Sequence, residues 1–239
     1  MPAEAVIRVS GLRRVFGAHL VLDGASLAVH DGEAVALLGA NGAGKTTLLK
    51  IVATLVRPTR GTVSVAGFDV ARQPEGVRSV IGLVAHGAHV YEDLTARENL
   101  RFWTTLHGLR PGAAELDGAL ALVELERAAD DRVRTFSAGM KRRLSLARIG
   151  LLQPRVLLLD EPFAGLDQRA KKWLAESLEA FKARGGTILM ATHSLGRELG
   201  VADRIAILAG GRIALDTERA PLSPDDIQRL YAAHTEEMT

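Results

Sequence analysis

Apolar and polar positions change their spacing several times along the chain, and each change predicts a different kind of element. Residues 45–56 carry the spacing of a helix with one apolar face, and the polar tail after Ala214 should end in one helix at 223–233. Other segments are apolar at nearly every position, which is typical of strands buried on both faces of a parallel sheet. These strand-length runs lie at residues 34–38, 62–65, 81–85, 156–159, 187–191 and 204–209. Alternation of such strands with helices favours an α/β fold.

Two stretches depart from this alternation. Short β-rich pieces lie near the start of the chain, at residues 6–9 and 20–29, whereas residues 94–152 are almost wholly helical. We therefore expect a helical subdomain inserted into the α/β core at about residues 87–150, within a single domain spanning residues 1–239.

Composition narrows the class of protein. Of the 239 residues, 47% are hydrophobic and 24% charged, and the formal net charge is only +2, with the basic residues scattered. Nothing here indicates a nucleic-acid partner. Cysteine is absent, which excludes disulfides and cysteine metal sites. No apolar run reaches the roughly 18–20 residues of a membrane helix, and no signal-peptide pattern is present. We expect a cytoplasmic protein whose membrane role, if it has one, comes through a partner.

A glycine-rich segment directly follows the first buried strand. The run Gly39-Ala40-Asn41-Gly42-Ala43-Gly44-Lys45-Thr46 matches G-x-x-x-x-G-K-[ST] in full. Between a strand and a helix, such glycines let backbone N–H groups converge on phosphate oxygens, and the helix N-terminus favours the negative charge. Lys45 would reach the β- and γ-phosphates, and the Thr46 hydroxyl would face Mg²⁺. The loop by itself indicates a nucleoside triphosphatase or a kinase.

Two acids end a later buried strand. Asp160 and Glu161 follow the apolar run at residues 156–159. Carboxylates at the end of a buried strand are unfavourable unless a cation or a proton is handled there. Asp160 is placed to hold Mg²⁺ beside the phosphates, and Glu161 to orient or deprotonate an attacking water.

Further segments resemble motifs of the ABC ATPases. Phe136-Ser137-Ala138-Gly139-Met140 is similar to their signature segment, and Pro162-Phe163-Ala164-Gly165-Leu166-Asp167 is similar to their D-loop. His193 follows an apolar strand where the family keeps its switch histidine, and Phe16 stands where it places an aromatic ring against adenine. The order of five motifs from Phe16 to His193 covers most of the chain.

The resemblance implies a fold, a reaction and a partner. The fold is a P-loop NTPase with a RecA-like core, an N-terminal antiparallel β subdomain and the inserted α-helical subdomain. The reaction is hydrolysis of ATP with Mg²⁺. The partner is a second copy of the chain, arranged head to tail so that Ser137 and Gly139 of one subunit close on the γ-phosphate held by Lys45 of the other. A serine hydroxyl and a glycine N–H at the start of a helix form an anion site, which agrees with this arrangement.

Site residues follow from the matched motifs. Glu161 and His193 are implied to be catalytic, with His193 against the γ-phosphate, and Thr46 and Asp160 to hold the metal. The implied ATP-binding residues are Phe16, Gly39, Ala40, Asn41, Gly42, Ala43, Gly44, Lys45, Thr46, Thr47, Ser137, Gly139 and Asp167.

The sequence departs from the family pattern at two places. Three of the five signature residues differ from Leu-Ser-Gly-Gly-Gln, but Ser137 and Gly139 are intact, so we expect activity to survive. His86 stands where most members have a glutamine that approaches Mg²⁺. Imidazole is a poor ligand for this hard ion, so we expect weak or water-mediated coordination. We also hypothesise that His86 makes hydrolysis pH-sensitive near neutrality.

The segment 88–106 is expected to form the groove that receives an integral membrane transporter subunit, with Thr95 and Glu98 forming a capping box at its helix. His86, together with the Ser-Ala-Gly signature running into Lys141-Arg142-Arg143, is similar to the haem-exporter ATP-binding subunit of cytochrome c biogenesis. We therefore expect an ATPase at the cytoplasmic face of the membrane that powers haem export. Alternatives are the ATPase of a drug or polysaccharide exporter, a soluble ABC ATPase of iron–sulfur cluster assembly or of ribosomes or DNA, and a kinase.

Overall fold

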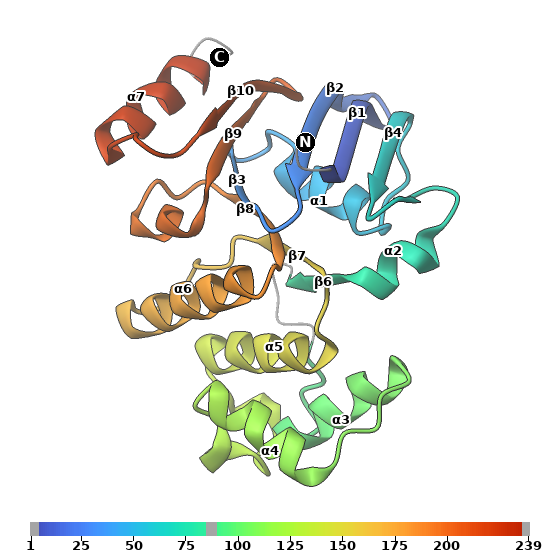
Figure 1. Cartoon of the computed structure of the whole chain (residues 1–239), viewed down its shortest axis with the longest axis vertical. Coiled ribbons are helices and arrows are strands. Elements are labelled where there is room, and N and C mark those ends of the chain that lie inside the picture. Colours follow the sequence, from blue (N-terminus) through green and yellow to red (C-terminus); the bar gives the residue numbers. More distant parts are fainter. Residues whose placement is uncertain (1–4, 85–89, 236–239) are drawn as a thin grey trace.

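The computed structural model of the protein describes residues 5–84 and 90–235, and a six-stranded sheet forms its centre (Figure 1). The strand order is β10-β9-β3-β8-β7-β6. All neighbouring pairs are parallel except β10, which pairs antiparallel with β9 at one edge. The bounds are β3 Ala34–Leu38, β6 Ile81–Val84, β7 Val156–Asp160, β8 Thr187–Thr192, β9 Arg204–Ala209 and β10 Arg212–Glu218.

The central strands β3, β7 and β8 are buried at every residue. Side chains on a strand alternate between its two faces, and here each face has its own apolar core. Val35 and Leu37 join one core, whereas Ala36 and Leu38 join the other. The predicted α/β class is thus confirmed. The strands whose sequences are continuous apolar runs are covered on both faces of the sheet.

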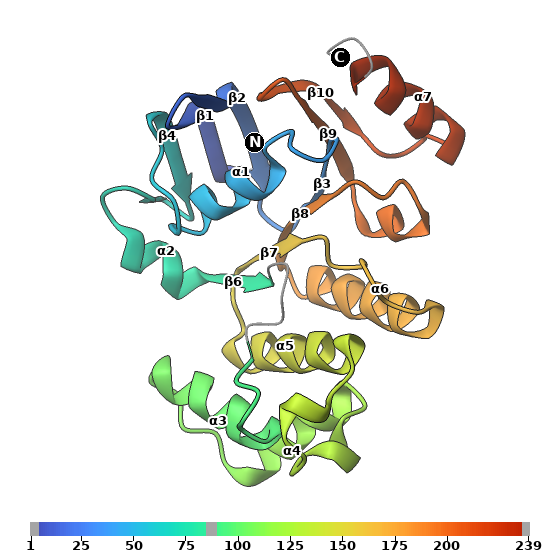
Figure 2. The same cartoon turned by 180° about the vertical axis from the view of Figure 1, so that it is seen from behind.

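An antiparallel sheet of order β2-β1-β4-β5 covers the first face. Helix α1 (Lys45–Val52) lies between the two sheets and contacts strands of both (Figures 1 and 2). Its Leu48 and Ile51 join the core shared with this sheet. The predicted N-terminal antiparallel part is confirmed. Its strands are β1 Ala5–Phe16, β2 His19–His30, β4 Arg60–Val65 and β5 Phe68–Asp69.

The helical stretch forms a third cluster at the end of the molecule away from that sheet (Figure 2). Its helices are α3 Ala96–Leu106, α4 Ala113–Leu122 and α5 Ala138–Leu152, with 3₁₀ turns at Glu126–Ala128 and Val133–Thr135. Leu100, Leu120 and Leu144 pack in a core of their own. The capping box predicted at α3 is confirmed, because Thr95 and Glu98 exchange hydrogen bonds with each other's backbone N–H.

Helices from the C-terminal half of the chain cover the second face of the central sheet. Helix α6 (Gln168–Ala183) buries Leu174 and Leu178 there, and α7 (Pro224–Thr235) adds Ile227 beside β9. The remaining elements are the short helix α2 (Pro74–Val80) and a 3₁₀ turn at Arg197–Val201. Within the described ranges, no helix combines the length and the apolar character needed to cross a bilayer.

Two predicted element ends are wrong. The first helix was expected to continue to residue 56 but ends at Val52, because Thr54 adopts a left-handed φ of 64° and Leu55 is 61% exposed. The helix predicted at 223–233 is confirmed as α7, but the polar tail begins later than expected, because Ala214 lies inside β10 (Arg212–Glu218). That strand alternates exposed and half-buried residues, so an edge position explains its polarity.

Candidate functional site

The glycine-rich segment forms the loop that joins the C-terminal end of β3 to the start of α1. Two of its glycines cannot be replaced without a clash. A Cβ on Gly39 would lie 2.5 Å from the main-chain oxygen of Leu208, and one on Gly44, at φ 105°, would lie 2.9 Å from Leu22. The loop is thereby pressed against β9 and the N-terminal hairpin, which holds its backbone in one shape.

Lys45 is the first residue of α1, and its side chain folds over the loop. The residue is only 6% exposed, and the ammonium donates to the carbonyl oxygens of Gly39 at 2.6 Å and Ala40 at 3.1 Å. Burial lowers the pKa of Lys45, while the charges of Glu161 and Asp160 act in the opposite direction. The hydrogen-bond partners of the buried Lys45 ammonium are neutral carbonyls. Negatively charged phosphate oxygens would therefore stabilise its charged form further.

Thr46 and Asp160 meet where α1 begins and β7 ends. The Thr46 hydroxyl donates to the Asp160 carboxylate at 2.9 and 3.1 Å from its two oxygens, and Asp160 is 4% exposed. Both ligand types are hard oxygen donors, which Mg²⁺ prefers. The chemistry of this pair therefore fits the predicted Mg²⁺ ion, and Thr46 is exposed to solvent.

Glu161, the next residue, turns the chain sharply away from β7. Its φ of 48° is left-handed, a conformation that is unfavourable by about 1–3 kcal/mol for a residue with a side chain. Its N–H is held by the carbonyl of Ala191 at 2.8 Å. The carboxylate accepts from the Thr192 hydroxyl at 3.1 Å and lies 2.8 Å from Nδ1 of His193. The acid and the histidine predicted from sequence are thus direct neighbours.

Two residues near this site were not predicted. Thr192 is the last residue of β8, which pairs with β7. A polar residue at the end of a buried strand could have indicated that Thr192 belongs to the site. Arg142, on α5, is 8% exposed and directs its guanidinium at the main chain of residues 160–162. Burial lowers the pKa of Arg142, with Asp160 and Glu161 opposing the shift.

Ser137, Gly139 and Asp167 lie at two helix starts. The Ser137 side chain accepts from Met140 N–H and caps α5, and Asp167 accepts from Ala170 N–H and caps α6. A Cβ on Gly139 would meet nothing closer than 3.9 Å, so packing within the chain does not require glycine there. In the described part of the chain, none of the hydrogen bonds of these residues leads to the phosphate loop.

Phe16 ends β1 with its ring 41% exposed. The Arg14 guanidinium lies 4.1 Å from the ring centroid and donates to the carbonyl of Arg57. One face of the ring is therefore occupied by a cation. Among the other predicted site residues, Asn41 is exposed and Thr47 half-buried. His86 lies outside the described residues.

An aromatic cluster, consisting of Tyr91, Phe102 and Trp103, lies at the start and along one side of α3. The Tyr91 and Phe102 rings meet edge to face at 4.7 Å, and Phe102 and Trp103 at 5.6 Å. Tyr91 and Phe102 remain 47% and 39% exposed. The Asn99 side chain fixes the Tyr91 backbone with hydrogen bonds of 2.8 and 2.9 Å. The cluster thus presents ordered aromatic surface to solvent.

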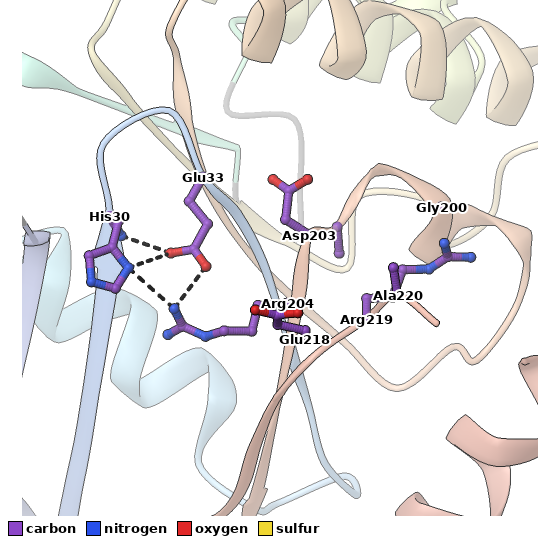
Figure 3. Close-up of a pocket in the computed structure, with 9 residues that line it drawn as sticks. His30, Glu33, Gly200, Asp203, Arg204, Glu218, Arg219 and Ala220 are labelled. Atoms are coloured by element: carbon purple, nitrogen blue, oxygen red, sulfur yellow. Dashed lines mark hydrogen bonds and ion pairs between the residues drawn. The ribbon is translucent and has the colours of Figure 1, made fainter. Parts of the chain in front are cut away.

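A cavity of about 570 Å³ lies elsewhere, at the N-terminal ends of β3 and β9 (Figure 3). Three of its polar side chains, His30, Glu33 and Arg204, face one another (Figure 3). Arg204 donates to Glu33 at 2.8 Å, and the other Glu33 oxygen lies 3.2 Å from His30 Nδ1. In parallel sheets, ligands bind outside the C-terminal ends of the strands, where Lys45 and Asp160 lie. We therefore place the candidate active site at the phosphate loop and not at this cavity.

Comparisons with known proteins show the family to which the chain belongs. The sequence model of a family described as ABC transporter matches residues 22–164. The daunorubicin resistance ATP-binding protein DrrA2 of Streptomyces coeruleorubidus is 42% identical over 226 residues, covering 94% of this chain and 69% of that protein. The Nod factor export ATP-binding protein I of Burkholderia lata is 40% identical, covering 87% and 69%. A solved structure of the ATP-binding subunit of an ABC transporter superposes with a TM-score of 0.83 at 34% identity, covering 96% of this chain and 94% of that one.

Proposed function

The chain belongs to the ABC transporter family as an ATP-binding subunit and is an ATPase, and from this premise we propose that it powers export through separate membrane subunits. The observation that carries the chemical part of the proposal is the convergence of Lys45, Thr46, Asp160 and Glu161 at the C-terminal ends of β3 and β7. Each of these side chains has the chemistry that one part of ATP hydrolysis requires.

Binding of ATP uses the loop and the ring beside it. Backbone N–H groups of residues 39–47 surround the phosphates, and the Lys45 ammonium exchanges its carbonyl partners for β- and γ-phosphate oxygens. The free face of Phe16 stacks on adenine. Thr46 and Asp160 hold Mg²⁺, which when bound neutralises phosphate charge.

Hydrolysis needs a group that orients water in line with the γ-phosphate. Glu161 is that group in our proposal, because its carboxylate is only 17% exposed and its backbone is fixed. It accepts the proton of the attacking water, while His193 contacts the γ-phosphate. Thr192 restrains the carboxylate through its hydroxyl.

The second half of each site comes from another copy of the chain. Ser137 and Gly139 lie at the start of α5, and among the described residues no atom lies closer than 3.9 Å to a Cβ placed on Gly139. We propose that they close on the γ-phosphate bound to the other subunit, with Asp167 at the same interface, so that two copies enclose two ATP molecules head to tail.

The membrane partner determines what is transported. The relatives named above serve daunorubicin resistance and Nod factor export, which favours a drug- or Nod-factor-type exporter over haem export. Haem export, expected from the sequence, finds no support in these names and stays a prediction. We propose that the aromatic cluster receives the membrane subunit and that the chain acts at the cytoplasmic face of the membrane.

The experiment is a pull-down of the tagged chain from gently solubilised membranes, with partners identified by mass spectrometry and the tag alone as control. Multi-span subunits unrelated to cytochrome c maturation support drug- or Nod-factor-type export. Subunits of the cytochrome c maturation type would restore haem export. Soluble partners alone would contradict the transport role and favour an ABC ATPase of another kind, such as one in iron–sulfur cluster assembly.

A further inference from the structure

The Arg142 side chain connects helix α5 of the helical cluster to the end of β7. Its Nη2 donates to the main-chain carbonyl of Glu161 at 2.5 Å and approaches that of Asp160 at 3.4 Å, and its Nε donates to that of Pro162 at 3.2 Å. Three consecutive carbonyls are therefore gathered by one guanidinium. The residue is 8% exposed, so water is not available to replace these hydrogen bonds.

These carbonyls need donors because of the conformation of Glu161. Its left-handed φ takes the chain out of β7, and the carbonyls of Glu161 and Pro162 accept from Arg142 on α5. The Glu161 carbonyl also accepts from Ala164 N–H at 3.2 Å, so Arg142 adds a second, shorter hydrogen bond to it. Buried carbonyls without a partner are strongly unfavourable. A guanidinium presents five N–H groups in a rigid fork, whereas a lysine ammonium concentrates three at a single point.

We propose that Arg142 is a positioning residue for ATP hydrolysis: by holding the carbonyls of residues 160–162, it keeps the Glu161 backbone in the conformation that directs the carboxylate to the attacking water. This inference rests on the proposed role of Glu161. Arg142 touches neither ATP nor water in this proposal, so its removal should slow the chemical step and leave nucleotide binding almost unchanged.

The same helix carries Ser137 and Gly139 at its start. Binding of the other subunit's γ-phosphate there would fix α5, and Arg142 lies one turn further along the same helix. Arg142 thus connects the occupancy of one ATP site to the placement of Glu161 in the other. Among the described contacts, the neighbouring Arg143 has no such role, because it donates to the Val123 carbonyl and the Glu124 carboxylate within the helical cluster.

That difference supplies a matched control. The full chain is purified as wild type, Arg142→Met, Arg142→Lys and Arg143→Met, and kcat, KM for Mg-ATP, the Kd of a fluorescent ATP analogue and the thermal unfolding midpoint are measured. For Arg142→Met we expect kcat to fall by up to about 100-fold, the loss that a misplaced catalytic group causes, with Kd nearly unchanged. Arg142→Lys should recover part of kcat, and Arg143→Met should remain close to wild type.

Wild-type kcat in Arg142→Met would overturn the proposal. So would equal losses in Arg142→Met and Arg143→Met, or a rise in Kd as large as the fall in kcat. If Arg142→Met does not fold, Arg142→Lys decides, since a folded lysine variant with wild-type kcat also overturns the proposal. Glu161→Gln is measured beside them: near-normal turnover in that variant refutes both roles, whereas an inactive Glu161→Gln with a fully active Arg142→Met refutes only the role of Arg142.

Discussion

The Thr46 hydroxyl lies 2.9 Å from a carboxylate oxygen of Asp160, although 114 residues separate the two in sequence. The contact joins the start of α1 to the end of β7 across β8, which lies between β3 and β7 in the sheet. A hydroxyl and a buried carboxylate this close form two oxygen donors for one hard cation. The proposed Mg²⁺ site can therefore be tested by changing either of these two residues.

Removal of the Thr46 hydroxyl should weaken binding of Mg²⁺. We expect Thr46→Val to raise the Mg²⁺ concentration for half-maximal ATPase activity by at least about tenfold, since even outer partners of metal ligands contribute that much. Thr46→Ser keeps the hydroxyl and should resemble wild type. Activity is measured over a Mg²⁺ titration at fixed ATP. Equal Mg²⁺ dependence of the valine and serine variants would rule out Thr46 as a ligand.

Glu161→Gln should abolish turnover and trap the ATP-bound dimer. The amide cannot accept the proton of the attacking water, and loss of a general base lowers the rate by about 10²–10⁴-fold. Turnover is followed by phosphate release, and dimerisation by size-exclusion chromatography with Mg-ATP. Glu176→Gln is the control, because that side chain is 65% exposed on α6. Near-normal turnover in Glu161→Gln would remove it from the role of base.

Phe16→Ala should weaken ATP binding without a comparable effect on kcat. Stacking of a base on an aromatic side chain contributes about 1–3 kcal/mol, which is about 30-fold in Kd at the centre of that range. Leu20→Ala removes a side chain of similar exposure, 46% against 41%, from the neighbouring strand and should bind ATP normally. Titration with a fluorescent ATP analogue distinguishes the two. Identical Kd values in both variants would contradict adenine stacking at Phe16.

Phe102→Ala should reduce the capture of membrane subunits. The Phe102 ring contacts both other members of the aromatic cluster, so its loss removes apolar surface and loosens its neighbours. Leu122→Ala, at a site on α4 that is 79% exposed, is the control for a general loss of apolar surface. Co-purification with membrane subunits is quantified for both variants. A larger loss with Leu122→Ala would place the docking surface elsewhere.

Asp23 should make stability depend on pH in acid. The hydrogen bond from Arg212 lowers the pKa of Asp23, with further contributions from the charges of Arg212 and Arg13. A carboxyl whose pKa is lowered on folding stabilises the fold above its ordinary pKa, and this contribution is lost as the pH falls through the lowered value.

Asp23→Asn should therefore be less stable than wild type at neutral pH, and the difference should close below the lowered pKa of Asp23. Urea unfolding over a series of pH values measures it. Asp93→Asn, whose side chain is 88% exposed, is the control for the loss of a surface carboxylate. A difference for Asp23→Asn that is constant with pH would contradict the assigned cause.

Much of the fold and of the phosphate site could be predicted because the responsible patterns are local. The loop motif lies within eight residues, and the runs at β3 and β9 predicted those strands with their observed bounds. Because parallel strands end at one edge of their sheet, the side chains of Thr46, Asp160 and His193 could be expected there together. β10 was missed because an edge strand has no continuous apolar run.

The role of Arg142 could not be predicted for a different reason. Lys141, Arg142 and Arg143 follow one another on a helix, where consecutive side chains point about 100° apart. Which of them faces the end of β7 depends on how α5 packs, and that depends on contacts between residues distant in sequence. The left-handed backbone of Glu161 is equally absent from any local pattern, since glycine is the residue that signals such a conformation.

The separate core of α3, α4 and α5 has a consequence for how such proteins diversify. Within the described residues, that core contains none of the phosphate loop and none of β7. If the membrane subunit binds the aromatic cluster as proposed, substitutions at Tyr91 or Phe102 can change which subunit is bound without altering the phosphate loop or β7. Related ATPases with the same catalytic residues could in this way act with transporters of different substrates.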